Sequence, residues 1–83
     1  MPFYTYVLYS EARNRYYVGS TFDLQIRLSQ HNSGMNKSTK SGIPWKIMYY
    51  EIFETYSLAV SREFQIKKKK SRKYIEWIIS SVG

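Results

Sequence analysis

The 83-residue sequence contains no cysteine and a single histidine, His31. Without cysteine the chain has no disulfide framework, no thiolate nucleophile and no cysteine-ligated zinc, and one histidine excludes a site built on several. No apolar run approaches the roughly 20 residues of a transmembrane helix, and residues 1–4 lack the basic and then apolar pattern of a signal peptide. The sequence therefore predicts one small cytoplasmic domain spanning residues 1–83, with no membrane partner.

Acidic residues are also scarce, and this leaves the chain strongly basic. Six Asp and Glu stand against 13 Lys and Arg, which gives a formal net charge of +7. Aromatic residues make up 18% of the chain, which is too many for a disordered basic tail. Most of these are tyrosines, which give a thin core a large apolar area. We therefore expect a folded basic domain in which most tyrosines are core residues.

The positive charge is concentrated in residues 62–73, where seven basic residues accompany one acid, Glu63. A dense basic stretch on a folded domain favours a polyphosphate partner, above all nucleic acid. The alternative is a solvated helix face with solubilising lysines. The candidate nucleic-acid contacts are Lys67, Lys68, Lys69, Lys70, Arg72 and Lys73, with Lys37 and Lys40 from a polar loop.

The chain divides into segments of strand and helix character. Segments rich in β-branched and aromatic residues predict strands, and they cover residues 3–9, 15–20 and 44–53. The short polar connection between the first two strands predicts an antiparallel hairpin. Helices are predicted over residues 23–32, from 57 to about 70, and after a cap at Ser71, where one face carries Ile75, Ile78, Ile79 and Val82.

Two polar side chains of the first predicted helix fall beside its apolar stripe. Arg27 and His31 are four residues apart and lie next to Leu24 and Leu28 on a helical wheel, so both point toward the sheet. An arginine in such a place is costly unless an anion meets it, although its long stem could also extend to the edge of the apolar surface. For His31 the alternative is a structural histidine with its hydrogen bonds satisfied.

The second predicted helix carries a carboxylate in a similar position. Glu63 falls within an apolar sector that runs from Ile66 to Phe64, where an acid should be paired, protonated or bound to a metal. A structural ion pair with a nearby Arg or Lys is the simpler interpretation. Together Arg27 and Glu63 supply the residue types for phosphodiester hydrolysis, a cation for the phosphate charge and a hard oxygen for a divalent ion. One carboxylate suits a single Mg²⁺ that keeps several waters, and argues against a two-metal site.

Motifs along nearly the whole chain carry a resemblance to a known family. In order they are Tyr4-Thr5-Tyr6, Tyr17-Val18-Gly19, Arg27, His31-Asn32-Ser33-Gly34, Ser38-Thr39-Lys40, Pro44-Trp45-Lys46 and residues 62–67. This ordered set resembles the GIY-YIG nuclease family, and more closely its small stand-alone, YhbQ-like group. The first motif reads Tyr-Thr-Tyr in place of Gly-Ile-Tyr, and only its last tyrosine enters the chemistry of the family.

The resemblance implies an α+β fold, a three-stranded antiparallel sheet flanked by about three helices. It implies that Tyr6 and Tyr17 are the paired tyrosines, one of them the general base. It further implies that Arg27 contacts the scissile phosphate and that Glu63 binds the divalent metal. His31 matches a position that assists catalysis in some members. The supporting candidates are Gly19, Asn32 and Thr39.

We therefore expect an endonuclease that acts on DNA with one Mg²⁺ or Mn²⁺. Its specificity should be weak or structure-dependent, because the predicted lysine contacts go to phosphates, which carry no sequence information. RNA is a second candidate substrate, and a protein partner or homodimer would add contacts. Two other classes compete: a basic nucleic-acid-binding module without catalysis, and a basic domain that binds an acidic protein. DNA repair, recombination, restriction and mobile-element functions all stay open at this point.

Overall fold

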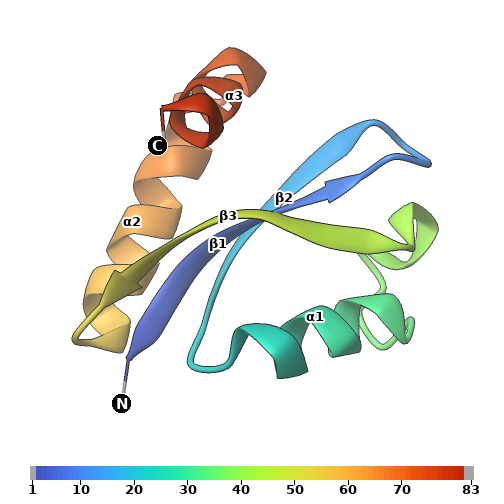
Figure 1. The fold of residues 1–83 in the computed structure, drawn as a ribbon, viewed down its shortest axis with the longest axis horizontal. Coiled ribbons are helices and arrows are strands. Elements are labelled where there is room, and N and C mark those ends of the chain that lie inside the picture. Colours follow the sequence, from blue (N-terminus) through green and yellow to red (C-terminus); the bar gives the residue numbers. More distant parts are fainter. Residues whose placement is uncertain (1, 82–83) are drawn as a thin grey trace.

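The computed structural model describes residues 2–81 (Figure 1). Its elements are β1 (Phe3–Ser10), β2 (Arg15–Thr21), α1 (Leu24–Asn32), a 3-10 helix η1 (Lys40–Gly42), β3 (Trp45–Phe53), α2 (Tyr56–Lys69) and α3 (Arg72–Ser80). The predicted order of strands and helices is confirmed, and η1 lies inside the segment predicted as a loop. Val82, expected on the apolar face of the last helix, lies outside the described residues. Within residues 2–81 no helix combines the length and apolarity needed to cross a bilayer.

The three strands form one antiparallel sheet in the order β2-β1-β3. The central strand β1 is buried at every position from Thr5 to Leu8, because it is covered on both faces. The register pairs Tyr6 with Gly19 and Leu8 with Tyr17. Side chains of directly paired residues lie on the same face of a sheet, so Tyr6 and Tyr17 share a face. The predicted α+β fold is therefore confirmed.

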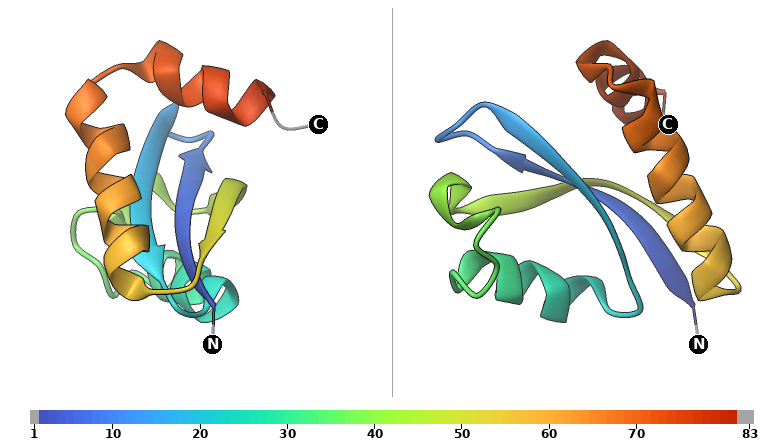
Figure 2. Two further views of the ribbon diagram at one scale, coloured as in Figure 1. Left: turned by 90° about the vertical axis from the view of Figure 1, so that its left-hand side faces the viewer. Right: turned by 180° about the vertical axis from the view of Figure 1, so that it is seen from behind.

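The twisted sheet carries a core on each face (Figures 1 and 2). On one face, Tyr6, Leu8 and Trp45 pack against residues of α1, Leu24 and Leu28. On the other face, a second cluster joins the sheet to α2 and α3 through Val7, Val18, Ile66 and Ile78. The sheet thus separates α1 from α2 and α3. Any site that uses both helix layers must therefore lie at an edge of the sheet.

Each of the three α-helices begins at a side chain that accepts a backbone hydrogen bond, as is typical of N-caps. These residues are Asp23 for α1, Thr55 for α2 and Ser71 for α3. Helix α2 thus begins at Tyr56, one residue before the predicted start at Ser57. It ends at Lys69 and is followed by the C-cap residue Lys70, whose φ of 48° and ψ of 39° lie in the left-handed region, where glycine is the usual residue.

Candidate active site

A buried chain of hydrogen bonds connects β1 to α1. Tyr6 Oη lies 3.1 Å from His31 Nε2, and His31 Nδ1 lies 2.9 Å from Thr39 Oγ1. The Thr39 hydroxyl donates its proton to the backbone oxygen of Asn36. It must therefore accept from the Nδ1–H of His31, which leaves Nε2 to accept the proton of the Tyr6 hydroxyl. The chain of bonds holds His31 as a neutral imidazole with its proton on Nδ1.

Burial makes both ring groups neutral near pH 7. Desolvation raises the pKa of Tyr6 to about 12, although the hydrogen bond from Arg27 opposes this shift. Desolvation also lowers the pKa of His31 to about 4, with the positive charge of Arg27 acting in the same direction. Tyr6 thus keeps its proton and directs it at His31. Of the paired tyrosines, Tyr6 is the one badly placed to act as a base.

The buried neutral His31 predicts a pH-dependent stability. Its pKa is about 4 in the folded chain and 6.5 in the unfolded one, so the unfolded state binds a proton first as the pH falls, and stability declines between these values. Between pH 7.5 and 4.5 we expect the wild type to lose about 2–3 kcal/mol more unfolding free energy than His31→Gln. Urea denaturation of both proteins at each pH measures this, because their carboxylate titrations are shared. Equal losses in the two proteins would contradict a neutral buried His31.

Arg27 lies beside both tyrosines and keeps capacity for an anion. Its Nε donates to Tyr6 Oη at 3.4 Å and its Nη1 donates to Gln30 Oε1 at 2.9 Å. The bond to Tyr6 is the main reason that the pKa of Arg27 is raised, and Tyr17 adds a smaller contribution. Among residues 2–81 no carboxylate oxygen lies within 4.0 Å of its guanidinium. Half-buried and without an acidic partner, Arg27 retains N–H groups that suit a phosphate.

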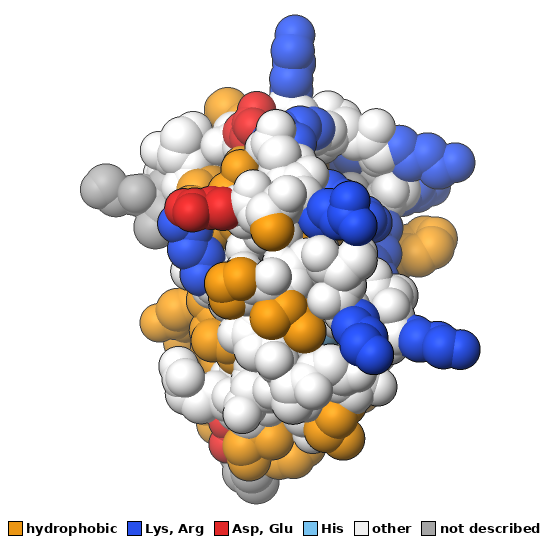
Figure 3. Space-filling view, turned by 90° about the vertical axis from the view of Figure 1, so that its right-hand side faces the viewer, with side chains coloured by type: hydrophobic (Ala, Val, Ile, Leu, Met, Phe, Trp, Pro, Cys, Tyr) orange, Lys and Arg blue, Asp and Glu red, His pale blue; other side chains and the backbone are white. Residues whose placement is uncertain are grey.

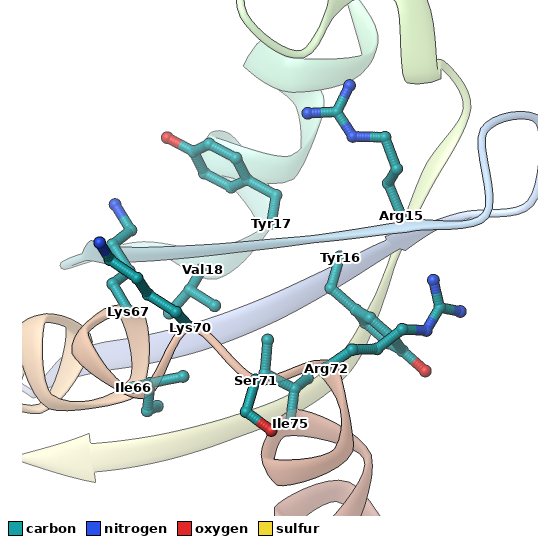
Figure 4. A pocket seen from close by; sticks show the side chains of 10 residues that line it. All are labelled: Arg15, Tyr16, Tyr17, Val18, Ile66, Lys67, Lys70, Ser71, Arg72 and Ile75. Atoms are coloured by element: carbon teal, nitrogen blue, oxygen red, sulfur yellow. The ribbon is translucent and has the colours of Figure 1, made fainter.

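Tyr17 is the partly exposed member of the pair. Its ring centroid lies 6.4 Å from that of Tyr6 and 4.8 Å from that of His31, and Trp45 supports the ring at 6.3 Å. It stands on β2, an edge strand, and Figure 4 shows its ring extending outward from that strand. The Tyr17 hydroxyl is therefore the one in the pair that a bound water can reach.

Gly19 is required for the close approach of Tyr6. A Cβ atom at residue 19 would lie 2.6 Å from the Tyr6 Cζ and would overlap its hydroxyl oxygen. Because the Tyr6 ring is buried and its hydroxyl is bonded to His31, it has little room to shift. The supporting role expected of Gly19 is thus steric, since only a residue without a side chain lets the ring lie across β2.

Glu63 approaches the edge of β2 from the opposite layer. Its Oε1 accepts from Ser20 Oγ at 2.6 Å, and its Oε2 is 2.6 Å from Lys67 Nζ. Ser20 points to the α2 side because it follows Gly19 on the strand. Lys67 in turn extends over the ring of Tyr17, with 5.7 Å between Nζ and the ring centroid. The candidate site therefore wraps around the β2 edge, with Glu63 on one side and the tyrosines on the other.

The expected apolar sector around Glu63 is partly wrong. Val60 and Phe64 are 40% and 66% exposed, whereas Ala59 and Ile66 face the sheet. The outer half of that sector faces solvent because α3 and the sheet cover only one side of α2. Glu63 therefore lies at the boundary between core and solvent, where it forms the lysine ion pair of the simpler interpretation and keeps its carboxylate partly exposed.

Several residues expected to support the site or to contact nucleic acid lie away from Tyr17 and Arg27. Thr39 is only 1% exposed and sits behind His31 as its hydrogen-bond partner. Asn32 holds the start of β3, where its side chain accepts from Trp45 N at 2.6 Å and donates to Trp45 O at 3.0 Å. Both act in the packing of α1 rather than at the rim of the site. Lys37 and Lys40 are exposed between α1 and β3, and neither lines the two pockets beside β2.

The basic segment divides into two groups. Lys67, Lys70 and Arg72 line a groove beside Tyr17, whereas Lys68, Lys69 and Lys73 are exposed outside it. Figure 3 shows Lys and Arg side chains gathered toward one side of the molecule. Three further site residues escaped the sequence analysis: Ser20, which holds Glu63, Gln30, which holds Arg27, and Arg15, which lines the groove. Strand alternation could have indicated Arg15, which lies two residues before Tyr17.

Comparison with known proteins identifies the family of this chain. The family model described as the GIY-YIG catalytic domain matches residues 2–75. A UPF0213 protein of Streptococcus pyogenes serotype M5 (strain Manfredo) is 41% identical over 70 residues, which cover 83% of this chain and 75% of that protein. A second UPF0213 protein, from Streptococcus pyogenes serotype M3 (strain SSI-1), is 42% identical over 57 residues, which cover 68% of this chain and 62% of that protein.

A solved structure has the same architecture. The solution NMR structure of a UPF0213 protein from Bacillus halodurans superposes with a TM-score of 0.61 at 28% sequence identity, and the match covers 100% of this chain and 87% of that one. The motifs, the antiparallel sheet and these relatives all point in the same direction. The chain belongs to the GIY-YIG nuclease family, and within it resembles the small UPF0213 proteins.

Proposed function

We propose that this protein is an endonuclease that hydrolyses phosphodiester bonds of DNA with the help of one divalent cation. The observation that supports this most is the convergence of three elements on the β2 edge: Arg27 of α1 lies beside Tyr17 of β2, and Lys67 links the Tyr17 ring to Glu63 of α2. Family membership makes a nucleic acid the expected substrate class. Weak or structure-dependent specificity follows from a site that offers contacts mainly to phosphates.

Arg27 is the residue proposed to bind the scissile phosphate. Negative charge builds up on the non-bridging oxygens as water attacks phosphorus, and a fixed guanidinium stabilises this charge more in the transition state than in the ground state. Tyr6 and Gln30 hold the guanidinium in place through two of its nitrogens. Because these bonds exist before substrate arrives, little reorganisation is needed at the moment of reaction.

Tyr17 is the residue proposed to orient the attacking water and, as the phenolate, to accept its proton. Tyr6 donates its proton to His31 and is buried, whereas Tyr17 is partly exposed between Arg27 and Lys67. His31 then acts as a positioning residue, since it holds Tyr6, which in turn holds Arg27.

Glu63 fits a single cation that keeps most of its water. An ionised carboxylate offers about four acceptor positions, of which Ser20 and Lys67 use two. Among residues 2–81 no three His, Asp or Glu side chains gather as a metal site, so water would complete the coordination sphere, as Mg²⁺ permits. When bound, Mg²⁺ or Mn²⁺ supplies positive charge that stabilises the leaving oxygen.

Nicking of supercoiled plasmid tests this proposal. We expect cleavage with Mg²⁺ or Mn²⁺ and none with EDTA, and we expect Glu63→Gln to need at least about tenfold more metal for half-maximal rate, because the amide carries no charge. The matched control is Glu54→Gln, an exposed glutamate in the turn before α2. A rate that is the same for Glu63→Gln at every metal concentration would refute the role of Glu63.

The ion pair between Glu63 and Lys67 favours a second candidate, a nucleic-acid-binding module without catalysis. In that case Lys67 simply neutralises the carboxylate. The logarithm of the binding constant for nucleic acid should then fall linearly with the logarithm of the salt concentration, and it should not depend on Mg²⁺. Salt-dependent binding, with a wild-type cleavage rate no faster than that of an Arg27→Ala preparation, would establish this second function in place of the first.

A further inference from the structure

A groove of about 380 Å³ runs beside the candidate site, between the first half of β2 and the junction of α2 with α3. Figure 4 shows Arg15 and Tyr17 extending from β2, with Lys67 of α2 and Lys70, the residue after α2, on the side of that helix. Tyr17 is part of both the groove and the candidate site. A ligand in the groove would therefore lie next to the candidate site, where Arg27 is proposed to bind the scissile phosphate. Its basic lining residues are Arg15, Lys67, Lys70 and Arg72.

Among residues 2–81, two of the four cations in the groove have no acidic partner. Lys67 is paired with Glu63, and Arg72 is paired with Glu76 at 3.2 Å. For Arg15 and Lys70, by contrast, no carboxylate oxygen within the described part of the chain lies within 4.0 Å. Because both side chains line the same groove, an anion bound there would meet two positive charges that no carboxylate neutralises.

Lys70 has a backbone conformation that is more favourable for glycine. Its φ of 48° lies in the left-handed region, which is unfavourable for a residue with a side chain and is usually filled by glycine at the end of a helix. The need to turn from α2 into α3 explains the conformation but not the lysine. The side chain of Lys70 lines the groove. A role in binding a ligand there would explain why this position carries a lysine.

The groove presents charges rather than free aromatic faces. The Tyr16 ring is covered by the Arg72 guanidinium, 5.0 Å from its centroid, and by Tyr9, also at 5.0 Å. The Tyr17 ring packs against His31 and lies under Lys67. Because both rings already pack against other side chains, the groove offers no free aromatic face on which a base could stack. The backbone phosphates of a nucleic acid match the exposed cations much better.

The opposite end of β2 is different in character. A second pocket, of about 320 Å³, is lined by Phe22, Asp23, Ile26 and Tyr56 along with Arg27, which is the only basic residue among its lining. Phe22, Ile26 and Tyr56 are all more than half exposed. Of these two pockets, only the groove beside Tyr17 therefore adds unpaired cations to Arg27.

We propose that the groove formed by Arg15, Lys67 and Lys70 beside Tyr17 is a phosphate subsite that holds the backbone of one nucleic-acid strand on a single side of the scissile bond. The role of this subsite in catalysis rests on the proposed function, whereas its binding of nucleic acid can be measured without cleavage. It divides the basic segment into residues that contact substrate, Lys67 and Lys70, and residues that do not, Lys68 among them.

Binding without cleavage tests the subsite. Fluorescence anisotropy in EDTA follows a labelled 12-nucleotide single strand and the corresponding duplex over a range of salt concentrations. Both Lys70→Gly and Arg15→Gln should weaken binding several-fold at low salt. Each should also reduce the slope of log K against log salt by about 0.7 for the single strand or 0.9 for the duplex, the value of one lost phosphate contact. Lys68→Ala removes the same charge from the same helix end and should leave the slope unchanged.

The stability of Lys70→Gly separates this subsite from a folding defect. Glycine suits the left-handed position, so the melting temperature should be equal to or higher than that of the wild type while binding falls. Equal losses for Lys70→Gly and Lys68→Ala would overturn the subsite in favour of a diffuse basic surface. Absence of binding to both oligonucleotides would overturn it as well. Intact groove-dependent binding with no plasmid cleavage would support the subsite and refute the proposed nuclease activity.

Discussion

Replacing Arg27 with alanine is expected to lower the rate of DNA cleavage by about 10²–10³-fold, the usual effect of removing one preorganised charge-stabilising group. The guanidinium is half-buried and held by Tyr6 and Gln30, so its charge acts where water screens it poorly. Because it should contact the phosphate most strongly in the transition state, kcat should fall more than KM rises. Single-turnover cleavage of a labelled oligonucleotide separates these two effects.

The matched control for this substitution is Arg13→Ala. Arg13 is exposed in the turn between β1 and β2, where its Nε donates to the backbone oxygen of Ser41, so it removes the same charge away from the site. Arg27→Lys keeps the charge but cannot reproduce both of the hydrogen bonds that fix the guanidinium, and it should restore only a small part of the rate. If Arg27→Ala and Arg13→Ala cleave at the same rate as the wild type, Arg27 has no catalytic role.

The paired tyrosines should respond differently to loss of the hydroxyl. Tyr17→Phe is expected to lower the cleavage rate by about 10²–10⁴-fold with little change in stability, the range for loss of a general base. Tyr6→Phe leaves the buried Nε2 of His31 without its donor and is expected to lower the unfolding free energy by about 1–3 kcal/mol. It also releases the Nε of Arg27, so a smaller loss of rate accompanies the loss of stability.

Two measurements on each variant distinguish these roles. Urea denaturation at pH 7.5 gives the stability, and single-turnover cleavage at a temperature where all variants are folded gives the rate. Tyr9→Phe is a suitable control, because its hydroxyl donates to Asn14 on the exposed hairpin and its side chain lies on the opposite face of β1 from that of Tyr6. A larger rate loss for Tyr6→Phe than for Tyr17→Phe would reverse the proposed assignment of the base.

The order of strands and helices could be predicted from local sequence, because each strand and helix contains its own composition or capping signal. The strands are marked by β-branched and aromatic residues, and Ser71 begins α3 as a cap, as predicted. The start of α2 was placed one residue late, because Ser57 and its true cap Thr55 are both good N-cap residues. The helical wheel correctly predicted that Arg27 and His31 face the sheet, because α1 packs one apolar face against the sheet.

The wheel failed for α2, where the apolar character of Val60 and Phe64 suggested burial. Hydrophobic periodicity reports which faces could be buried but not which face the rest of the chain covers. The sheet and α3 cover only the side that carries Ala59 and Ile66. Glu63 reaches the site for a different reason, through a hydrogen bond to Ser20 across 43 residues of sequence, which no local pattern encodes.

The sequence by itself determined the basic charge, the order of elements, the family and the residue types of a phosphodiester chemistry, because these depend on composition and short-range spacing. Only the tertiary structure decided that Tyr6 and Tyr17 share a face, since this depends on the register of β1 against β2. It also decided that burial leaves Tyr6 protonated and Tyr17 accessible, and that Lys67 and Lys70 turn toward the groove while Lys68 does not. Register, burial and the folding of α2 against the β2 edge are long-range properties, and they convert a list of candidate residues into a site.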